Sequence, residues 1–265
     1  GVHCAIANGT AHCHKENASV ALVEERFMKN IRIGAHRGAM AYQPENTLAA
    51  FETAIKQGAY RIEFDIRRTR DGHLVVIHDE TVDRTTDGEG SVADLTLSEL
   101  KKLRSGNEEI PTLDEAISCM RNRARLLVEF KEEYIAEQAV RQIEAARVVD
   151  QCTLSSFHEG ALLESRTLNR EIEIAYFLVE PKPFDAAEVV ERFGAGLLIV
   201  WPAAASSQCL ADARAHGLDV RCGFRDSLTY EETREYLRAL YPLGVSEFSC
   251  GRPDWIGQII AELEE

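Results

Sequence analysis

Residues 61–79 read RIEFDIRRTRDGHLVVIHD, and this stretch decides how many strands of the chain can run parallel. It holds two short runs rich in apolar residues, at 61–66 and 74–77, which are typical of strands. The seven residues between them are too few for a helical crossover, and Asp71-Gly72 is a strong signal for a two-residue hairpin turn. We therefore expect the second run to return antiparallel along the first.

Elsewhere, apolar and β-branched runs alternate with segments of helical periodicity, which predicts a parallel sheet with helical crossovers. Strands are expected at 32–35, 61–66, 74–77, 125–130, 152–155, 172–178, 197–200, 219–224 and 245–248. Helices are expected at 47–57, 113–120, 135–147, 160–168, 186–193, 208–216, 230–240 and 254–263. Asn46 is the expected N-cap of the first helix.

With the run at 74–77 set aside as a hairpin return, eight parallel strands remain. The 265 residues agree with the about 250 of a typical (β/α)8 barrel. The predicted fold class is therefore α/β, a (β/α)8 TIM barrel with a hairpin extension of its second strand and a small insertion after it.

Two segments fall outside the alternating pattern. Residues at about 79–112 are rich in Asp, Gly and Thr, and we expect them to be the insertion of the barrel domain 31–265, not a separate domain. Residues 1–30 contain one helical pattern at about 19–29, which we expect to cap the bottom of the barrel as an N-terminal extension. The His and Cys residues of this extension match no zinc-ligand spacing.

Composition narrows the class of partner. The formal net charge of −14 disfavours nucleic acid and anionic membrane surfaces, so we expect a small-molecule partner. The longest nearly apolar run, 194–205, is too short for a membrane span, and no signal-peptide pattern opens the chain. The seven scattered cysteines favour buried thiols in a reducing compartment such as the cytoplasm, with a mature secreted or periplasmic form as the alternative. No feature predicts an oligomeric state.

Three carboxylates stand at neighbouring predicted strand ends, where barrel enzymes build their active sites. Glu63 and Asp65 belong to the second strand, and Glu129 belongs to the third strand of the barrel. Three acidic oxygen donors suit a hard cation, Mg²⁺ or Ca²⁺. Ion pairs with Arg37 and Lys131 are the structural alternative for these carboxylates.

Two cations and two histidines accompany the carboxylates. Arg37 can bind a phosphate as a bidentate fork, and Lys131 can bind it as a point charge. His36 and His78 can exchange protons near neutral pH. Together with a metal ion, these residue types indicate phosphodiester cleavage.

The turn at Asp71-Gly72 also makes a prediction about His78. A two-residue turn would pair position 65 with position 78, and cross-strand partners share a face of the sheet. We therefore expect His78 beside Asp65, on the face that also carries Glu63.

Seven motifs follow one another: AHRG at 35–38, PENT at 44–47, EFD at 63–65, VIHD at 76–79, RTTDGEG at 84–90, PTLDEAI at 111–117 and EFK at 129–131. In order and spacing they resemble those of the glycerophosphodiester phosphodiesterase family. The resemblance covers about residues 31–131 and is thin afterwards, where SSF at 155–157 is a weaker match.

The resemblance implies a TIM barrel that acts as a phosphoric diester hydrolase. It implies one divalent cation held by Glu63, Asp65 and Glu129, with His36 and His78 as acid–base residues. The residues implied to bind the phosphate or support its site are Arg37, Lys131 and Glu45. In the implied mechanism, a hydroxyl beside the phosphoester attacks phosphorus, a cyclic phosphate forms, and water opens it.

The later strands depart from the family pattern. The positions of a Trp-Thr-x-Asn stretch at the penultimate strand fall on Gly223, Phe224 and Asp226. Cys250-Gly251 stand where Thr-Asp usually ends the last strand. The half expected to hold metal and phosphate is kept, whereas the half expected to contact the alcohol is altered.

The altered half leaves two interpretations of the substrate pocket. Gly223 would open one wall to a polyhydroxylated group, with Arg225 or Asp226 bonding its hydroxyls. Alternatively, Trp201 or Phe224 fills the gap. A lipid-cleaving phospholipase D is disfavoured, because Trp201-Pro202 is the one apolar strand-end loop that the sequence suggests.

We therefore expect metal-dependent hydrolysis of a small soluble glycerophosphodiester to glycerol phosphate and an alcohol. One alternative is the same chemistry on a sugar phosphodiester of the opine type. The second alternative is a barrel that binds a phosphate ligand without turnover.

Overall fold

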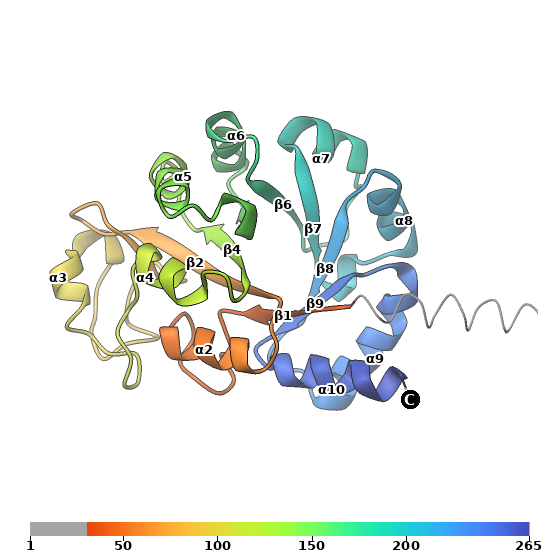
Figure 1. Cartoon of the computed structure of the whole chain (residues 1–265), viewed down its shortest axis with the longest axis horizontal. Helices are drawn as coiled ribbons and strands as arrows, with labels where there is room; N and C mark the ends of the chain where they lie inside the picture. The colour runs from red at the N-terminus through yellow and green to blue at the C-terminus, as the bar shows by residue number, and fades with distance from the viewer. Residues whose placement is uncertain (1–30, 265) are drawn as a thin grey trace, which may run out of the picture.

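A computed structural model describes residues 31–264, and eight parallel strands form a closed barrel at its centre (Figure 1). The ring closes because β1 pairs with both β2 and β9. The barrel strands are β1 (Arg32–His36), β2 (Arg61–Arg68), β4 (Arg125–Phe130), β5 (Cys152–Ser156), β6 (Glu173–Leu178), β7 (Ala195–Val200), β8 (Asp219–Gly223) and β9 (Glu247–Cys250). The predicted (β/α)8 barrel is confirmed.

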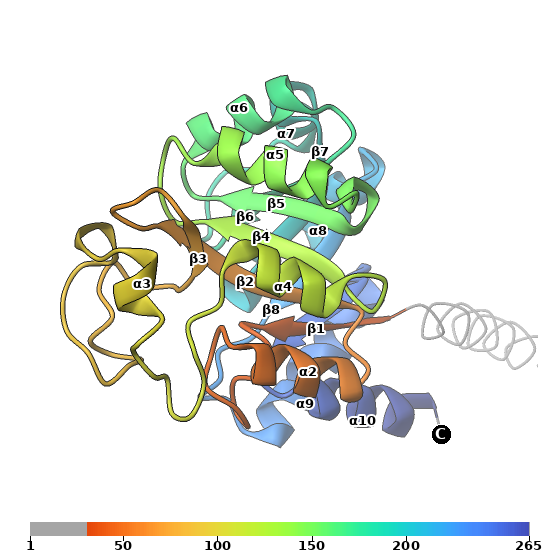
Figure 2. The same cartoon turned by 60° about the vertical axis from the view of Figure 1, so that its left-hand side comes forward.

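Helices surround the barrel and cover the outward faces of its strands (Figures 1 and 2). They are α2 (Leu48–Lys56), α4 (Leu113–Met120), α5 (Ala136–Ala145), α6 (Glu159–Leu168), α7 (Ala186–Phe193), α8 (Ser207–Ala215), α9 (Tyr230–Leu240) and α10 (Pro253–Glu264). The alternation along a strand decides what faces them, since Ile62, Phe64 and Ile66 of β2 join the apolar core. The polar residues between them, Glu63 and Asp65, are left for the barrel interior.

Local sequence signals set several helix boundaries. Thr112 caps α4 in a capping box with Glu115, and Gly194 ends α7 in the left-handed conformation at φ 61°. The prediction of Asn46 as the cap of α2 is wrong, because Thr47 is the residue whose side chain accepts from the helix. Asn46 has φ 59°, a left-handed conformation that an N-cap does not adopt.

The predicted hairpin is present, but its predicted register is wrong by one residue. β3 (Leu74–Val76) runs antiparallel to β2 outside the ring, with Ile66 opposite Val76. Gly72, at φ 85°, completes a three-residue turn, since the amide of Thr69 donates to the carbonyl of His73. A turn one residue longer than expected places Ile77, not His78, opposite Asp65.

The segment between β3 and α4 has its own small apolar cluster. It contains the 3₁₀ turn η1 (Val92–Asp94) and the short helix α3 (Leu97–Leu100). The buried side chains of this cluster are Val75, which belongs to β3, and Ile77, Val82, Val92, Leu100 and Ile110. Figures 1 and 2 show α3 at the end of the barrel toward which the β2 arrow points. The predicted N-terminal extension, 1–30, lies outside the described residues.

The opposite end of the barrel interior is charged, which the sequence analysis did not anticipate. Arg221 bonds Glu247, and Arg61 Nε lies 3.5 Å from the other oxygen of Glu247. All three side chains are almost completely buried. Gly34 makes room for this network, because a Cβ there would lie 2.7 Å from Arg221 Nη1.

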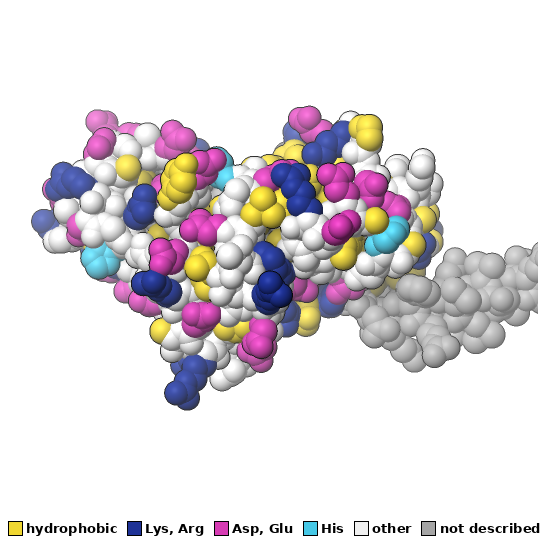
Figure 3. Space-filling view, turned by 90° about the horizontal axis from the view of Figure 1, so that it is seen from above, with side chains coloured by type: hydrophobic (Ala, Val, Ile, Leu, Met, Phe, Trp, Pro, Cys, Tyr) yellow, Lys and Arg dark blue, Asp and Glu magenta, His cyan; other side chains and the backbone are white. Residues whose placement is uncertain are grey.

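In Figure 3, the side on which α5, α6 and α7 lie shows acidic and basic side chains interspersed. None of the helices between residues 31 and 264 combines the length and apolar character needed to cross a membrane. Five cysteines of the described part are free thiols, at positions 119, 152, 209, 222 and 250.

Candidate active site

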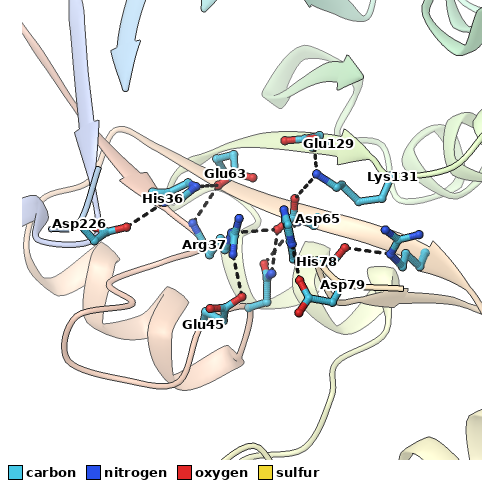
Figure 4. A network of polar contacts seen from close by, with 12 residues as sticks. His36, Arg37, Glu45, Glu63, Asp65, His78, Asp79, Glu129, Lys131 and Asp226 are labelled. Atoms are coloured by element: carbon cyan, nitrogen blue, oxygen red, sulfur yellow. Dashed lines mark hydrogen bonds and ion pairs between the residues drawn. The ribbon is translucent and has the colours of Figure 1, made fainter. Parts of the chain in front are cut away.

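A cavity of about 410 Å³ opens at the carboxyl ends of the barrel strands. It brings together eleven of the residues singled out from the sequence, which are His36, Arg37, Glu63, His78, Glu129, Lys131, Trp201, Gly223, Phe224, Arg225 and Asp226. Asp65 lies beneath them in the acidic cluster, and Glu45 borders a smaller neighbouring pocket with His78. Residues from distant parts of the sequence therefore meet in one place (Figure 4).

Three carboxylates form the acidic cluster of the cavity. One oxygen from each of Glu63, Asp65 and Glu129 lies within 4.8 Å of the others, and all three residues are buried. Burial and the neighbouring charge of Asp65 raise the pKa of Glu63, and the same two causes raise the pKa of Glu129 to about 7. The Oδ1 atom of Asp65 is buried without a hydrogen-bond partner. Three converging oxygen donors with an unsatisfied oxygen fit a hard divalent cation.

Two cations flank the acidic cluster. Arg37 Nε lies 3.3 Å from Asp65 Oδ2, and its backbone N–H donates to Glu63 Oε2 at 2.9 Å. Lys131 Nζ donates to Glu129 Oε1 at 2.7 Å and lies 3.7 Å from Asp65 Oδ1. The ion pairs expected as the structural alternative are therefore present. A metal ion could still compete for the carboxylates, and a phosphate could compete for Arg37 and Lys131.

A carboxylate orients the imidazole of His36. Its Nδ1 lies 3.2 Å from Asp226 Oδ2, and its Nε2 lies 3.9 Å from Glu63 Oε2 (Figure 4). Burial lowers the pKa of His36, but the hydrogen bond to Asp226 and the charge of Glu63 outweigh burial, so the pKa is raised overall. Asp226 itself is held by the backbone N–H of Gly251 at 2.5 Å.

A second carboxylate orients His78. Its Nδ1 lies 2.6 Å from Asp79 Oδ1, which leaves Nε2 for the cavity. Burial lowers the pKa of His78, and the opposing effects of Asp65 and Asp79 do not fully restore it. The two histidines therefore differ, since the pKa of one is raised and that of the other is lowered. His78 reaches the site although the predicted register was wrong. The β2–β3 ladder ends at Val76, so His78 lies beyond the strand, where the alternation of side chains no longer sets its direction.

Arg84, from the segment after β3, connects the carboxylate beside His78 with the carboxylate beside Arg37. Its guanidinium donates to Asp79 Oδ2 at 2.6 Å and to both oxygens of Glu45 at 2.8 Å. Glu45 accepts in turn from Arg37 at 2.9 Å. A continuous chain of ion pairs therefore runs from Arg37 through Glu45, Arg84 and Asp79 to His78.

Three residues of this site had no expected role in it, Asn46, Asp79 and Arg84, and a fourth, Asp226, was expected to bond the alcohol and not His36. Asn46 donates to Asp65 Oδ2 at 2.9 Å, a role hidden by its position in front of a helix. Asp79 could have been found from its place beside His78, and Arg84 from its motif RTTDGEG. The contact of Asp226 with His36 could not, because only closure of the barrel through β9 brings the end of β8 near the end of β1.

The other side of the cavity is apolar. Trp201 lies beside Gly223, where a Cβ would be 3.6 Å from the ring, and both residues line the cavity. Arg225 stands over the Trp201 ring at 5.4 Å. Phe224 touches the cavity but is mostly buried, and it stacks on Phe248.

Comparison with protein-family models matches residues 36–222 of the chain to the glycerophosphoryl diester phosphodiesterase family. A glycerophosphodiester phosphodiesterase of Caldanaerobacter subterraneus subsp. tengcongensis is 41% identical over 172 residues, which are 58% of this chain and 70% of that protein. One of Bacillus altitudinis is 36% identical over 164 residues, 56% of this chain and 67% of that protein.

Solved structures show the same relationship. A glycerophosphodiester phosphodiesterase of Agrobacterium tumefaciens superposes with a TM-score of 0.76 at 29% identity, over 86% of this chain and 99% of that chain. A phosphodiesterase of Oleispira antarctica, in complex with the product sn-glycerol-3-phosphate, has a TM-score of 0.76 at 29% identity, over 87% of this chain and 96% of that chain.

Proposed function

The chain belongs to the glycerophosphoryl diester phosphodiesterase family, and from this premise we propose that it hydrolyses a small glycerophosphodiester to glycerol phosphate and an alcohol. Family membership makes it a phosphoric diester hydrolase. The observation that carries the finer proposal is the cavity in which three buried carboxylates, two cations and two histidines meet. The product bound to the Oleispira antarctica enzyme supports glycerol phosphate as the product.

Glu63, Asp65 and Glu129 would hold one divalent metal ion, Mg²⁺ or Ca²⁺. The unsatisfied Oδ1 of Asp65 and the raised pKa values of the other two carboxyl groups support this role, because a cation would relieve their mutual repulsion. When bound, such an ion favours ionisation of a nearby hydroxyl and offsets negative charge on the phosphoryl oxygens. Arg37 and Lys131 would bind the same phosphoryl oxygens.

The two histidines would share the proton transfers of the first step. His78, whose pKa is lowered, would accept the proton of the glycerol hydroxyl that attacks phosphorus. His36, whose pKa is raised, would donate a proton to the oxygen of the departing alcohol. The phosphorus–oxygen bond to the alcohol breaks as the bond to the glycerol hydroxyl forms, which leaves a cyclic glycerol phosphate.

The second step would reverse the two roles. His36, now neutral, accepts a proton from a water molecule that attacks the cyclic phosphate. His78, now protonated, returns its proton to the glycerol oxygen as the ring opens. Asp226 and Asp79 would hold the two imidazoles in one tautomer throughout, since each occupies Nδ1 and leaves Nε2 for the substrate.

A sugar phosphodiester of the opine type remains a second candidate substrate, but the geometry gives it less support. Trp201 lies beside Gly223, where a Cβ would be 3.6 Å from its ring, and this ring limits the extra volume expected there. Asp226, one of the two groups expected to bond sugar hydroxyls, is engaged by His36 and Gly251.

A panel of phosphodiesters tests the proposed function. The purified chain should release glycerol phosphate from glycerophosphodiesters when Mg²⁺ or Ca²⁺ is added, and excess chelator should stop the release. Faster cleavage of a sugar phosphodiester than of any glycerophosphodiester would show that the proposed substrate is wrong. Undiminished turnover in chelator would exclude the metal ion, and binding of glycerol phosphate without any turnover would indicate a binding barrel.

A further inference from the structure

The side of the cavity that faces the charged residues is a continuous apolar wall. It is built at three consecutive strand ends, β5, β6 and β7, from the side chains of Phe157, Phe177, Val179, Ile199 and Trp201. These side chains border the same cavity as His36 and Lys131. A group attached to a phosphate in the charged half can therefore extend directly onto the apolar wall.

Two rings of this wall are unusually exposed for their size. Phe157 is 56% exposed and Trp201 is 40% exposed. Phe157 stacks flat on Phe177, with ring centroids 4.4 Å apart and planes 6° apart. Exposed apolar surface of this kind, gathered at the rim of a polar site, is typical of a ligand contact.

The charges around the cavity indicate whether a cationic or an uncharged alcohol suits this wall. The cavity has one acidic residue apart from the metal-binding cluster, Asp226, and both of its oxygens are occupied by His36 and Gly251. Arg225 adds a positive charge at the wall, because its guanidinium lies over the Trp201 ring. A cationic alcohol such as choline would compete with Arg225 for the Trp201 ring and be repelled by its charge, whereas an uncharged alkyl chain or ring would not.

We propose that the alcohol released by this enzyme carries an uncharged apolar chain or ring, which lies against Phe157, Phe177 and Trp201 while the phosphate occupies the charged half. The inference rests on the proposed phosphodiesterase function and narrows its substrate class. It also revises the expectation from the sequence, in which Trp201 was the one candidate for an apolar rim and polyhydroxylated alcohols were the main alternative.

The test is a series of glycerol 3-phosphate diesters of methanol, butanol, hexanol and octanol, together with glycerophosphocholine, all below micelle-forming concentrations. We expect kcat/KM to rise with chain length, by up to about fourfold for each methylene that the wall buries. The octyl diester should exceed glycerophosphocholine by about tenfold or more. A flat dependence on chain length, or a preference for glycerophosphocholine, would overturn the inference and leave the proposed function intact. Failure to cleave even the shortest diester, with Mg²⁺ or Ca²⁺ present, would overturn both.

Two variants test whether the dependence of kcat/KM on chain length arises at this wall. Phe157→Ser and Trp201→Ser should each flatten the dependence on chain length, and Leu168→Ser, which alters a similarly exposed residue at the end of α6, should preserve it. A dependence that survives in both wall variants would overturn the assignment to this wall. Inhibition of the unmodified enzyme by alkyl phosphates of increasing length provides a measurement independent of variant folding, and the inhibition constant should fall as the chain lengthens.

Discussion

The strand ends from β1 to β4 carry charged groups, whereas those from β5 to β7 carry apolar rings, although both halves project side chains from equivalent positions of one barrel. In the charged half, each group depends on a named partner at hydrogen-bond distance, as His78 depends on Asp79. In the apolar half, contacts such as that of Phe157 with Phe177 depend on shape alone. Substitution should therefore be costly in the first half and tolerated in the second.

The largest effect is expected in the acidic cluster. Glu63→Ala removes one of three proposed metal-binding oxygens and the acceptor for the Arg37 amide. Turnover should fall by about 10³-fold or more, since loss of metal assistance costs several kcal/mol. Calorimetric titration with Mg²⁺ or Ca²⁺ should show the parallel loss of ion binding. Glu235→Ala, at an exposed position of α9, is the matched control. Ion binding that persists in Glu63→Ala would remove Glu63 from the ligand set.

The same cluster should give the metal-free protein an unusual pH dependence. The pKa of Glu129 rises from 4.5 to about 7 in the folded chain, mainly through burial and then through Asp65. The folded state therefore holds its proton where the unfolded state has lost it, and the contribution of Glu129 to stability is fully present below pH 4.5 and is lost as pH rises through 7. The corresponding free energy is on the order of 3 kcal/mol for this group.

Thermal unfolding in chelator measures this dependence. The midpoint should fall between pH 5 and pH 7.5, and adding Mg²⁺ or Ca²⁺ should raise it more at pH 7.5 than at pH 5. Glu129→Gln should flatten the profile, because it removes the titrating group. A midpoint that rises with pH in the unmodified metal-free protein would contradict the sign of this prediction.

The histidines come next in expected effect. His36→Ala and His78→Ala should each lower kcat by on the order of 10²-fold, the usual contribution of an acid–base group. Ion binding should persist in both variants. His216→Ala, at the C-cap of α8, is the control and should leave kcat unchanged. A normal kcat in either site variant would assign the proton transfers elsewhere.

Arg84 tests whether the charged half works as a connected unit. Its forked guanidinium spans Glu45 and Asp79, and a lysine ammonium cannot reproduce both pairs. Arg84→Lys should therefore lower kcat by roughly tenfold with little change in KM, because His78 loses the support of Asp79. The same exchange at Arg70, an exposed residue paired with Glu99, should have no effect on kcat. If kcat is unchanged in both variants, the chain of ion pairs is not needed for turnover.

This contrast also explains how much the sequence could predict. In the charged half, each function requires a particular side chain, so motifs such as EFD and VIHD predict both the residues and their meeting place. The barrel itself follows from alternating strands and helices. The apolar wall gave almost no signal, because many combinations of rings fill the same space. The buried ion network of Arg221 and Glu247, and the contact of Asp226 with His36, depend on closure of the barrel and on no local pattern.

Two glycines of the barrel interior give the smallest and most discriminating comparison. At Gly34, a Cβ would lie 2.7 Å from Arg221 Nη1 and 2.8 Å from Ser249 Cβ, both in tightly packed surroundings. Gly34→Ala should therefore lower the free energy of unfolding by about 1–3 kcal/mol, as overpacking does. At Gly223, the nearest atoms to such a Cβ would lie 3.6 and 3.7 Å away on Trp201, at ordinary contact distance from a ring that is 40% exposed.

Gly223→Ala should therefore change stability by less than about 0.5 kcal/mol, the range of a harmless surface substitution, and kcat/KM by less than about twofold. Denaturant unfolding of both variants, measured beside the unmodified protein, provides the comparison. A cost at Gly223 as large as that at Gly34 would mean that Trp201 is held rigidly. The wall around it would then be as intolerant of change as the charged half, and its departure from the family pattern would require a specific partner, not merely a fitting shape.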